Sequence, residues 1–244
     1  MKNISVIIPA RFKSSRFPGK PLTKIQGKEM IIRVCEICKK VIKKKNIYVA
    51  TDDERIIKVV KKFGFNSIKT HKSCLTGTDR VFQAAKKIKS KIIINVQGDE
   101  PVIDPSDIKK IINAKIKFPN HVICGFNEIP YSKAENINIP KVVFDRNFDM
   151  VYMSRALIPK SKKINYINKV FKQVCIYGFN LKQLKEFSSL KSKGSLEKIE
   201  DIELLRFLDL KTKVKMVKVS NRSISVDIRS DIKKVVKFLK NEKN

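Results

Sequence analysis

The chain has 244 residues, 42% of them hydrophobic, so it is long enough for one large α/β domain with a core of its own. Its 54 Lys and Arg residues exceed its 23 Asp and Glu residues by a net charge of +31, but the lysines are dispersed, so we expect no dedicated nucleic-acid partner. No run approaches 18 consecutive apolar residues and the first residues lack a signal-peptide pattern, which excludes membrane insertion and predicts a cytoplasmic protein.

The first half of the chain alternates short apolar strands with amphipathic helices. Residues 4–9 predict the first strand, and Met30, Val34, Ile37 and Val41 then recur at the spacing of a helix. The alternation continues along residues 46–51, 52–64, 66–70, 76–88 and 91–101. This pattern predicts an α/β fold with a mostly parallel, Rossmann-like sheet covered by helices on both faces.

From about residue 119 onward, polar or proline-containing links separate the predicted strands. Strands are expected over residues 121–127, 140–145, 150–156 and 172–180, and we interpret residues 119–180 as a smaller mixed or antiparallel portion. A helix over 194–210 with Ser195 as its cap, a strand over 213–220 and a helix over 231–240 follow. No repeat or clear boundary is visible, so residues 1–244 are predicted to form a single domain.

Charged residues gather on two loops at predicted strand ends. Arg11, Arg16 and Lys20 follow the first strand, and Asp99 and Glu100 follow a later apolar run. Ligands of open α/β sheets bind beyond the carboxyl ends of the strands, so both loops are expected to face one crevice. A cationic loop suits a polyphosphate, and an anionic loop beside it suits Mg²⁺, which binds carboxylates together with phosphate oxygens. The two loops predict a nucleoside triphosphate site, although the phosphate-loop and dinucleotide glycine motifs are absent.

Cysteine and histidine give little support for another kind of catalytic centre. The five cysteines are irregularly spaced, and Cys35 and Cys38 form a C-x-x-C pair inside a helical pattern without a second pair. We expect free, buried thiols. Because His71 and His121 are the only histidines, a histidine-based triad or metal cage is poorly supported.

Several motifs occur together in an order that is typical of one family. From residue 4 to about residue 237, the chain resembles the CMP-Kdo synthetases, which are the 3-deoxy-manno-octulosonate (Kdo) cytidylyltransferases. The resemblance rests on IIPARFKSSRFPGKPL, ATDD, TGTDR, NVQGDEP, MSRALIP, IYGF and LEKIEDIELLRFL followed by SVD. The related sialate cytidylyltransferases carry a different loop after the first strand, and the UTP- and GTP-dependent sugar pyrophosphorylases usually have a glycine-rich loop that this chain lacks.

The resemblance implies a nucleotidyltransferase fold and an enzyme that couples CTP to a 3-deoxy-ulosonic acid sugar, Kdo or a close analogue. The products would be pyrophosphate and a CMP-sugar for lipopolysaccharide or capsule synthesis. The implied catalytic residues are Arg11, Arg16 and Lys20, which would hold the triphosphate, and Asp99 and Asp227, which would share Mg²⁺ as cofactor. Ala10 and Gly77 would lie near the cytidine. Family members are commonly homodimers, and residues 119–180 would then supply the sugar-binding and dimerisation portion.

For the sugar side, the resemblance points to Arg80, Gln97, Arg155, Gln173, Tyr177, Glu200 and Glu203. The chain departs from the family here: Gln173 stands where a histidine is common, Cys175 replaces a glycine, and the usual G-V-D-T-P-E-D-L reads SVDIRSDI. These differences leave an amino-substituted Kdo or another acidic ulosonate open as the sugar.

Other interpretations of these residues stand beside the resemblance. Taken alone, Arg155 fits a surface ion pair, Tyr177 fits the core, and glutamates spaced every three residues fit a solvated acidic stripe. A nucleic-acid-binding protein on a degenerate nucleotidyltransferase fold is the alternative that the net charge of +31 would favour.

Overall fold

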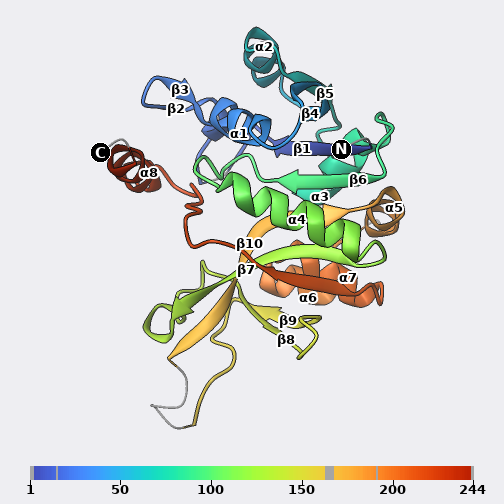
Figure 1. Cartoon of the computed structure of the whole chain (residues 1–244), viewed down its shortest axis with the longest axis vertical. Helices are drawn as coiled ribbons and strands as arrows, with labels where there is room; N and C mark the ends of the chain where they lie inside the picture. Colours follow the sequence, from blue (N-terminus) through green and yellow to red (C-terminus); the bar gives the residue numbers. More distant parts are fainter. Residues whose placement is uncertain (1–2, 15, 163–167, 191, 243–244) are drawn as a thin grey trace.

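One sheet runs through the molecule and includes both its parallel strands and its antiparallel strands (Figure 1). The computed structural model describes residues 3–14, 16–162, 168–190 and 192–242, and within them this sheet has nine strands. Four of them are parallel neighbours, in the order β6 (Ile92–Val96), β1 (Ile4–Ala10), β4 (Ile47–Thr51) and β5 (Asn66–Lys69). Every residue of β1 is buried, as expected for a central strand with helices on both faces. The predicted parallel sheet is confirmed.

The rest of the sheet is mixed, as the sequence predicts. The long strand β10 (Lys169–Phe179) pairs antiparallel with both β6 and β7 (Val122–Pro130), and β7 pairs parallel with β11 (Val214–Lys218). The register of β10 on β7 shifts between Val174 and Tyr177, which marks a β-bulge. Before the bulge, at Lys172, β10 also pairs with β8 (Lys141–Phe144), which in turn pairs with β9 (Met150–Ser154) in the lower part of Figure 1.

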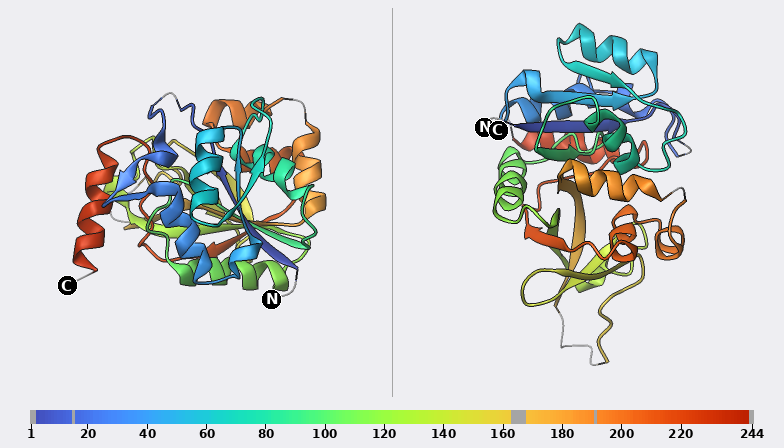
Figure 2. Two further views of the ribbon diagram at one scale, coloured as in Figure 1. Left: turned by 90° about the horizontal axis from the view of Figure 1, so that it is seen from above. Right: turned by 90° about the vertical axis from the view of Figure 1, so that its right-hand side faces the viewer.

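Helices cover both faces of the sheet, because alternate side chains of each strand point to opposite faces (Figure 2). Val6 and Ile8 pack with α1 (Met30–Lys39), α2 (Glu54–Lys62) and α4 (Pro105–Lys117). Ile7 packs on the other face with α3 (Gly77–Ala85), α5 (Leu181–Ser189) and α7 (Arg206–Asp209). None of the helices in the described ranges is both long and apolar enough to cross a membrane.

The C-terminal helix α8 (Asp231–Asn241) packs away from the main layers. Its Val235 belongs to a small separate core with Phe17, Ile25 and Val226. Ile25 lies in a short hairpin formed by β2 (Lys24–Ile25) and β3 (Lys28–Glu29), which the sequence analysis did not predict. This core anchors the end of the basic loop to the segment that carries Asp227.

Two helices were also not predicted, although both begin with clear signals. In α4, the Asp104 side chain accepts the backbone N–H of Ser106, and Pro105 occupies the first helical position. In α5, Asn180 and Gln183 form a reciprocal capping box. Both helices are marked in the sequence by their N-caps, Asp104 and Asn180, a signal that is separate from apolar periodicity.

The single helix predicted over residues 194–210 is wrong. The structure divides this segment into α6 (Ser195–Glu200), a 3-10 turn η4 (Glu203–Leu205) and α7, with Asp201 in the left-handed region at φ 48°. The N-cap of α6 is Gly194, not Ser195 as predicted, and no side chain caps this helix. Glu197, Glu200 and Glu203 therefore do not lie along one helix face. Glu197 is fully buried, so the interpretation of these glutamates as a solvated acidic stripe is also wrong.

Substitutions at Asp201 test this break. The left-handed backbone costs an L-residue about 1–2 kcal/mol but costs glycine almost nothing. We expect Asp201→Gly to be more stable than Asp201→Ala by about 1 kcal/mol in urea unfolding. Both variants lose the same carboxylate, so the comparison isolates the backbone. A continuous helix would reverse the order, because glycine is about 1 kcal/mol worse than alanine inside a helix.

Candidate active site

A cavity of about 390 Å³ opens at the carboxyl ends of β1 and β6. All of the sequence-predicted site residues except Glu200 line it. They come from the two loops, the start of α3, strand β10 and the segments around residues 155, 203 and 227. The lining members of the predicted set are Ala10, Arg11, Arg16, Lys20, Gly77, Arg80, Gln97, Asp99, Arg155, Gln173, Tyr177, Glu203 and Asp227.

Lys20 joins three distant segments of this cavity. Its Nζ lies 2.6 Å from Oδ2 of Asp99 and donates a hydrogen bond of 2.8 Å to the Val226 carbonyl. The Val226 N–H in turn donates to the Asp99 carbonyl at 2.9 Å. The basic loop, the acidic loop and the segment before Asp227 therefore meet at one ammonium group.

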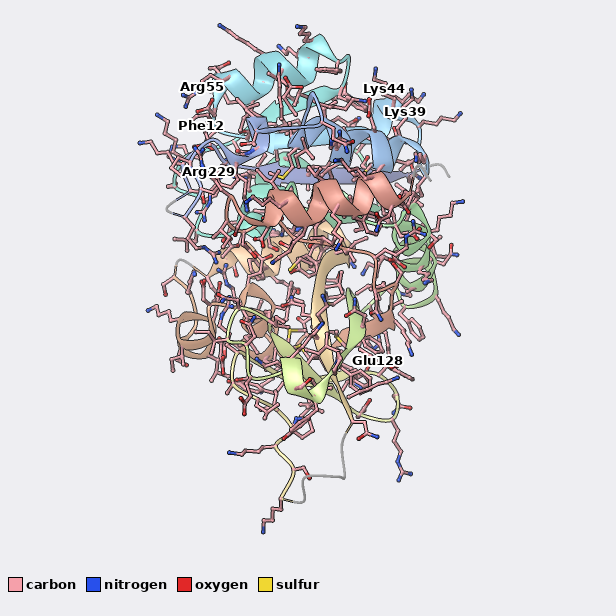
Figure 3. All side chains as sticks on the ribbon, turned by 90° about the vertical axis from the view of Figure 1, so that its left-hand side faces the viewer. Phe12, Lys39, Lys44, Arg55, Glu128 and Arg229 are labelled. Carbon is pink, nitrogen blue, oxygen red and sulfur yellow. The ribbon has the colours of Figure 1, made fainter. Side chains whose placement is uncertain are left out.

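The basic loop folds back on itself, so that Gly19 contacts Phe12. Gly19 has φ 73° and donates its N–H to the Phe12 carbonyl at 2.9 Å, and a side chain at Gly19 would begin 3.2 Å from the Phe12 ring. The Arg55 guanidinium lies 3.3 Å above the same ring, and Figure 3 shows the two side chains together. Lys13, by contrast, is exposed and does not line the cavity.

The acidic loop approaches β1 very closely. A Cβ atom at Gly98 would lie 2.9 Å from the Pro9 carbonyl oxygen, so a larger residue would push the two loops apart. Beside it, Asp99 and Asp227 both line the cavity, and Arg16 lies 3.4 Å from the Asp227 carboxylate. Two carboxylates facing a cavity with cationic walls fit Mg²⁺, which takes few protein ligands and completes its shell with phosphate oxygens and water.

Glu100 is buried behind this pair. Burial, and after it the charge of Asp99, raise the pKa of Glu100 to about 7. Its carboxyl group accepts the hydroxyl of Ser223. Glu100 therefore ties the acidic loop to the chain segment that leads to Asp227.

The two arginines predicted for the sugar are both held by protein groups. Arg80 is buried, with Nη1 3.0 Å from the Asp52 carboxylate and 2.5 Å from the Thr70 hydroxyl. Its positive charge is thus largely balanced within the protein. Arg155 instead donates to backbone carbonyls, at 2.6 Å to Glu200 and 3.1 Å to Ile137. Arg155 also lies 3.9 Å from the Asp201 carboxylate, a longer ion pair than the one of 3.0 Å between Arg80 and Asp52.

The other sugar-side candidates form a polar wall. Gln173 donates its amide to the Tyr177 hydroxyl at 3.0 Å, and both side chains are buried. Glu203 accepts the Thr78 N–H at 3.1 Å and the Gln97 amide at 3.4 Å, and burial raises the pKa of Glu203. Tyr177 also lines the cavity and belongs to the apolar core. Its ring packs among apolar side chains, and its hydroxyl accepts the Gln173 amide.

Glu200 lies behind the wall that it was predicted to form. Its carboxylate accepts the Ser154 hydroxyl at 2.7 Å and the Arg155 N–H at 2.7 Å. These bonds fix the end of β9 on α6 and thereby orient Arg155.

Lys193 and Asp201 line the cavity but were missed in the sequence analysis. The Lys193 ammonium lies 2.9 Å from the Asp201 carboxylate, on the side of the cavity where Arg155 lies. Neither residue belongs to a recognisable motif. Helical periodicity predicts a continuous helix here, so it does not indicate the left-handed turn at Asp201 that brings the pair to the cavity.

The chain is similar to proteins of known family. A sequence model of the cytidylyltransferase family matches residues 5–216. The chain is 38% identical to the 3-deoxy-manno-octulosonate cytidylyltransferase of Desulfatibacillum aliphaticivorans, covering 98% of this chain and 99% of that protein. It is 39% identical to the 8-amino-3,8-dideoxy-manno-octulosonate cytidylyltransferase of Shewanella sp. strain W3-18-1, covering 95% and 96%.

The fold agrees with this assignment. The structure superimposes on a CMP:2-keto-3-deoxy-manno-octonic acid synthetase complexed with CTP with a TM-score of 0.92, at 32% identity over 99% of this chain and all of that one. A 4-diphosphocytidyl-2C-methyl-D-erythritol synthase from Anaerococcus prevotii, at 18% identity and a TM-score of 0.63, shares the fold. With its charged loops, its cavity and its matched sequence, this chain belongs to the cytidylyltransferase family and is a nucleotidyltransferase.

Proposed function

We propose that the enzyme couples CTP to Kdo, or to a close 3-deoxy-ulosonic acid, and releases the CMP-sugar and pyrophosphate. The observation that carries this proposal is the meeting of Lys20, Asp99 and the Val226–Asp227 segment in a cavity that also contains a polar wall for a sugar. Relatives named for Kdo and for its 8-amino analogue match over almost the whole chain, which supports this substrate class.

The reaction replaces one bond to the α-phosphorus with another. The anomeric hydroxyl of the sugar attacks the α-phosphorus of CTP, the bond to the bridging oxygen breaks, and pyrophosphate leaves with that electron pair. The hydroxyl proton passes to solvent or to a phosphate oxygen. Most of the protein's task is to hold the reactants in line and to offset negative charge.

Residues of the basic loop are suited to the phosphate part of this task. Arg11, Arg16 and Lys20 line one cavity, and we assign them to the triphosphate and the departing pyrophosphate. Asp99 and Asp227 would hold Mg²⁺, which when bound would neutralise phosphate oxygens. On the opposite wall, we assign Arg155 to the sugar carboxylate and Gln97, Gln173 and Glu203 to its hydroxyls.

Assembly and cellular role extend this proposal. We infer a cytoplasmic homodimer formed through residues 119–180, whose product serves lipopolysaccharide or capsule synthesis. Ile137 and Val151 are 67% and 59% exposed in this portion, which supports a subunit contact there.

Pyrophosphate release tests the proposed activity. The purified chain is given each of the four ribonucleoside triphosphates in turn, with Kdo and Mg²⁺. We expect release with CTP, weak or no release with ATP, GTP or UTP, and none without sugar or with a chelator in excess. Tight, salt-sensitive nucleic-acid binding without CTP turnover would favour the nucleic-acid-binding alternative instead.

Two lysines of the basic loop provide a matched pair. Lys20→Ala removes an ammonium that contacts the acidic loop, whereas Lys13→Ala removes an exposed one outside the cavity. We expect Lys20→Ala to lower kcat/KM for CTP by about 10²- to 10³-fold, the scale of one lost electrostatic contact in a water-poor site. Lys13→Ala should stay within a few-fold of wild type. Equal losses would mean that the loop attracts anions by charge alone.

Gln173 bears on the choice between Kdo and an amino-sugar analogue. Its amide donates and accepts hydrogen bonds but cannot become a cation, so it does not repel a substrate ammonium. We expect Gln173→His to shift the ratio of kcat/KM toward Kdo and away from 8-amino-Kdo. Gln83→His, on α3 outside the cavity, is the control.

The two sugars must be compared under identical conditions. An unchanged ratio in Gln173→His would contradict a role of residue 173 in sugar choice. So would a wild-type preference for Kdo above about a hundredfold, which exceeds what a permissive pocket allows.

A further inference from the structure

Arg206 is a fully buried arginine to which the proposed reaction gives no role. Its Nε and Nη2 each donate to the Glu197 carboxylate at 2.7 Å, and Glu197 is fully buried as well. Nη1 donates to the Asp79 carboxylate at 3.2 Å and to the Phe187 carbonyl at 3.2 Å. The guanidinium also lies 3.8 Å from the centre of the Phe187 ring. It thus connects α3, α5, α6 and α7.

The Asp79 carboxylate transmits this contact to the cavity. It accepts the Thr76 N–H at 3.1 Å, the Thr76 hydroxyl at 2.8 Å and the Ser188 hydroxyl at 2.8 Å. Thr76 is the N-cap of α3, and both Thr76 and Gly77 line the cavity. The conformation of this part of the wall therefore depends on where the Asp79 carboxylate is held.

A second contact joins the same two segments inside the cavity. Glu203, three residues before Arg206, accepts the Thr78 N–H at 3.1 Å and the Gln97 amide at 3.4 Å. The segment from η4 to α7 thus contacts the start of α3 at two points, Glu203 in the cavity and Arg206 behind it. A shift of Arg206 would move the nucleotide-side wall and the sugar-side carboxylate together.

Arg206 also changes the electrostatics of the wall. Asp79 stands within the first turn of α3, whose N-terminus faces the cavity at Gly77. An uncompensated carboxylate there would repel a triphosphate, and the buried guanidinium offsets that charge. Burying one cation between two carboxylates is expensive unless every donor is used, and the fork of Arg206 uses its donors on both carboxylates and a carbonyl.

We propose that Arg206 is a positioning residue: through Asp79 it sets the Thr76–Gly77 wall for CTP, and through η4 it sets Glu203 for the sugar. This inference rests on the proposed function. A residue that serves only stability would lower the melting temperature and leave the affinity of folded molecules unchanged, so affinity separates the two roles.

The test uses Arg206→Lys in the full chain, with Arg146→Lys, the same change in an exposed hairpin loop, as control. CTP affinity is measured by calorimetry well below the melting temperature of each variant, and the sugar KM is measured by pyrophosphate release. Lysine keeps the charge but cannot reach both carboxylates. We expect Arg206→Lys to raise the CTP Kd and the sugar KM at least tenfold, and Arg146→Lys to match wild type.

Hydrogen exchange supplies a local readout. In Arg206→Lys, the amides of residues 76–79 should exchange faster than in wild type, while those of β1 and β4 should not. Unchanged CTP Kd in folded Arg206→Lys would overturn the inference. If Arg206→Lys does not fold, the CTP Kd of Asp79→Asn is measured instead. A raised Kd would support the inference, and an unchanged Kd would contradict it. Failure of the wild-type chain to bind CTP would instead overturn the proposed function itself.

Discussion

Close contact between the ends of β1 and β6 is the constraint on which the site depends. The two strands are parallel neighbours, and Gly98 permits the acidic loop to pass against the Pro9 carbonyl. Oppositely charged loops are thereby brought within ion-pair distance at Lys20 and Asp99. A cation and a carboxylate at one point suit a ligand that carries phosphates and a divalent metal together, because each charge type can bind its own partner.

Buried cations hold the segments around this contact. Besides Arg206, Lys115 and Lys141 are almost completely buried and donate to main-chain carbonyls of loops. Lys141 contacts the Arg155 carbonyl and the Asn136 carbonyl, so it joins the backbone at the cavity-lining Arg155 to the loop at Asn136. Removing an ammonium from water costs several kcal/mol unless its protons are accepted, and the carbonyls of irregular loops supply the acceptors. In a lysine-rich chain, these few lysines are structural.

The sequence predicted those features that depend on local patterns. The apolar runs gave β1 and β6, and the charge of the following loops located most of the cavity. Caps were overlooked, so α4 and α5 were missed although Asp104 and Asn180 mark their first turns. Periodicity also hid the left-handed turn at Asp201. Arg155 donates to the Asp201 carbonyl at this turn from a distant part of the chain, and no window of neighbouring residues contains that contact.

Specific pairings at the site were the least predictable. Arg80 and Arg155 look alike as isolated arginines, yet Arg80 pairs with Asp52 at 3.0 Å, whereas Arg155 donates mainly to backbone carbonyls and lies 3.9 Å from the Asp201 carboxylate. Which partner an arginine meets is decided by the packing of α3 on β4 and of α6 on β9. The resemblance to a family predicts that both residues lie near the sugar, but only three-dimensional contacts reveal the partners of each guanidinium.

Strand β10 changes its neighbour at the bulge between Val174 and Tyr177, since it pairs with β8 before this point and with β6 after it. Of the cavity-lining residues of β10, Gln173 still pairs in register with Phe126 of β7, whereas Cys175 lies at the bulge. In evolutionary terms, residue 175 stands outside the regular ladder that Ile176 to Phe179 form with β6, so we expect its exchange to leave that ladder in register. We expect a substitution there to change the cavity wall without moving the loops that follow β1 and β6.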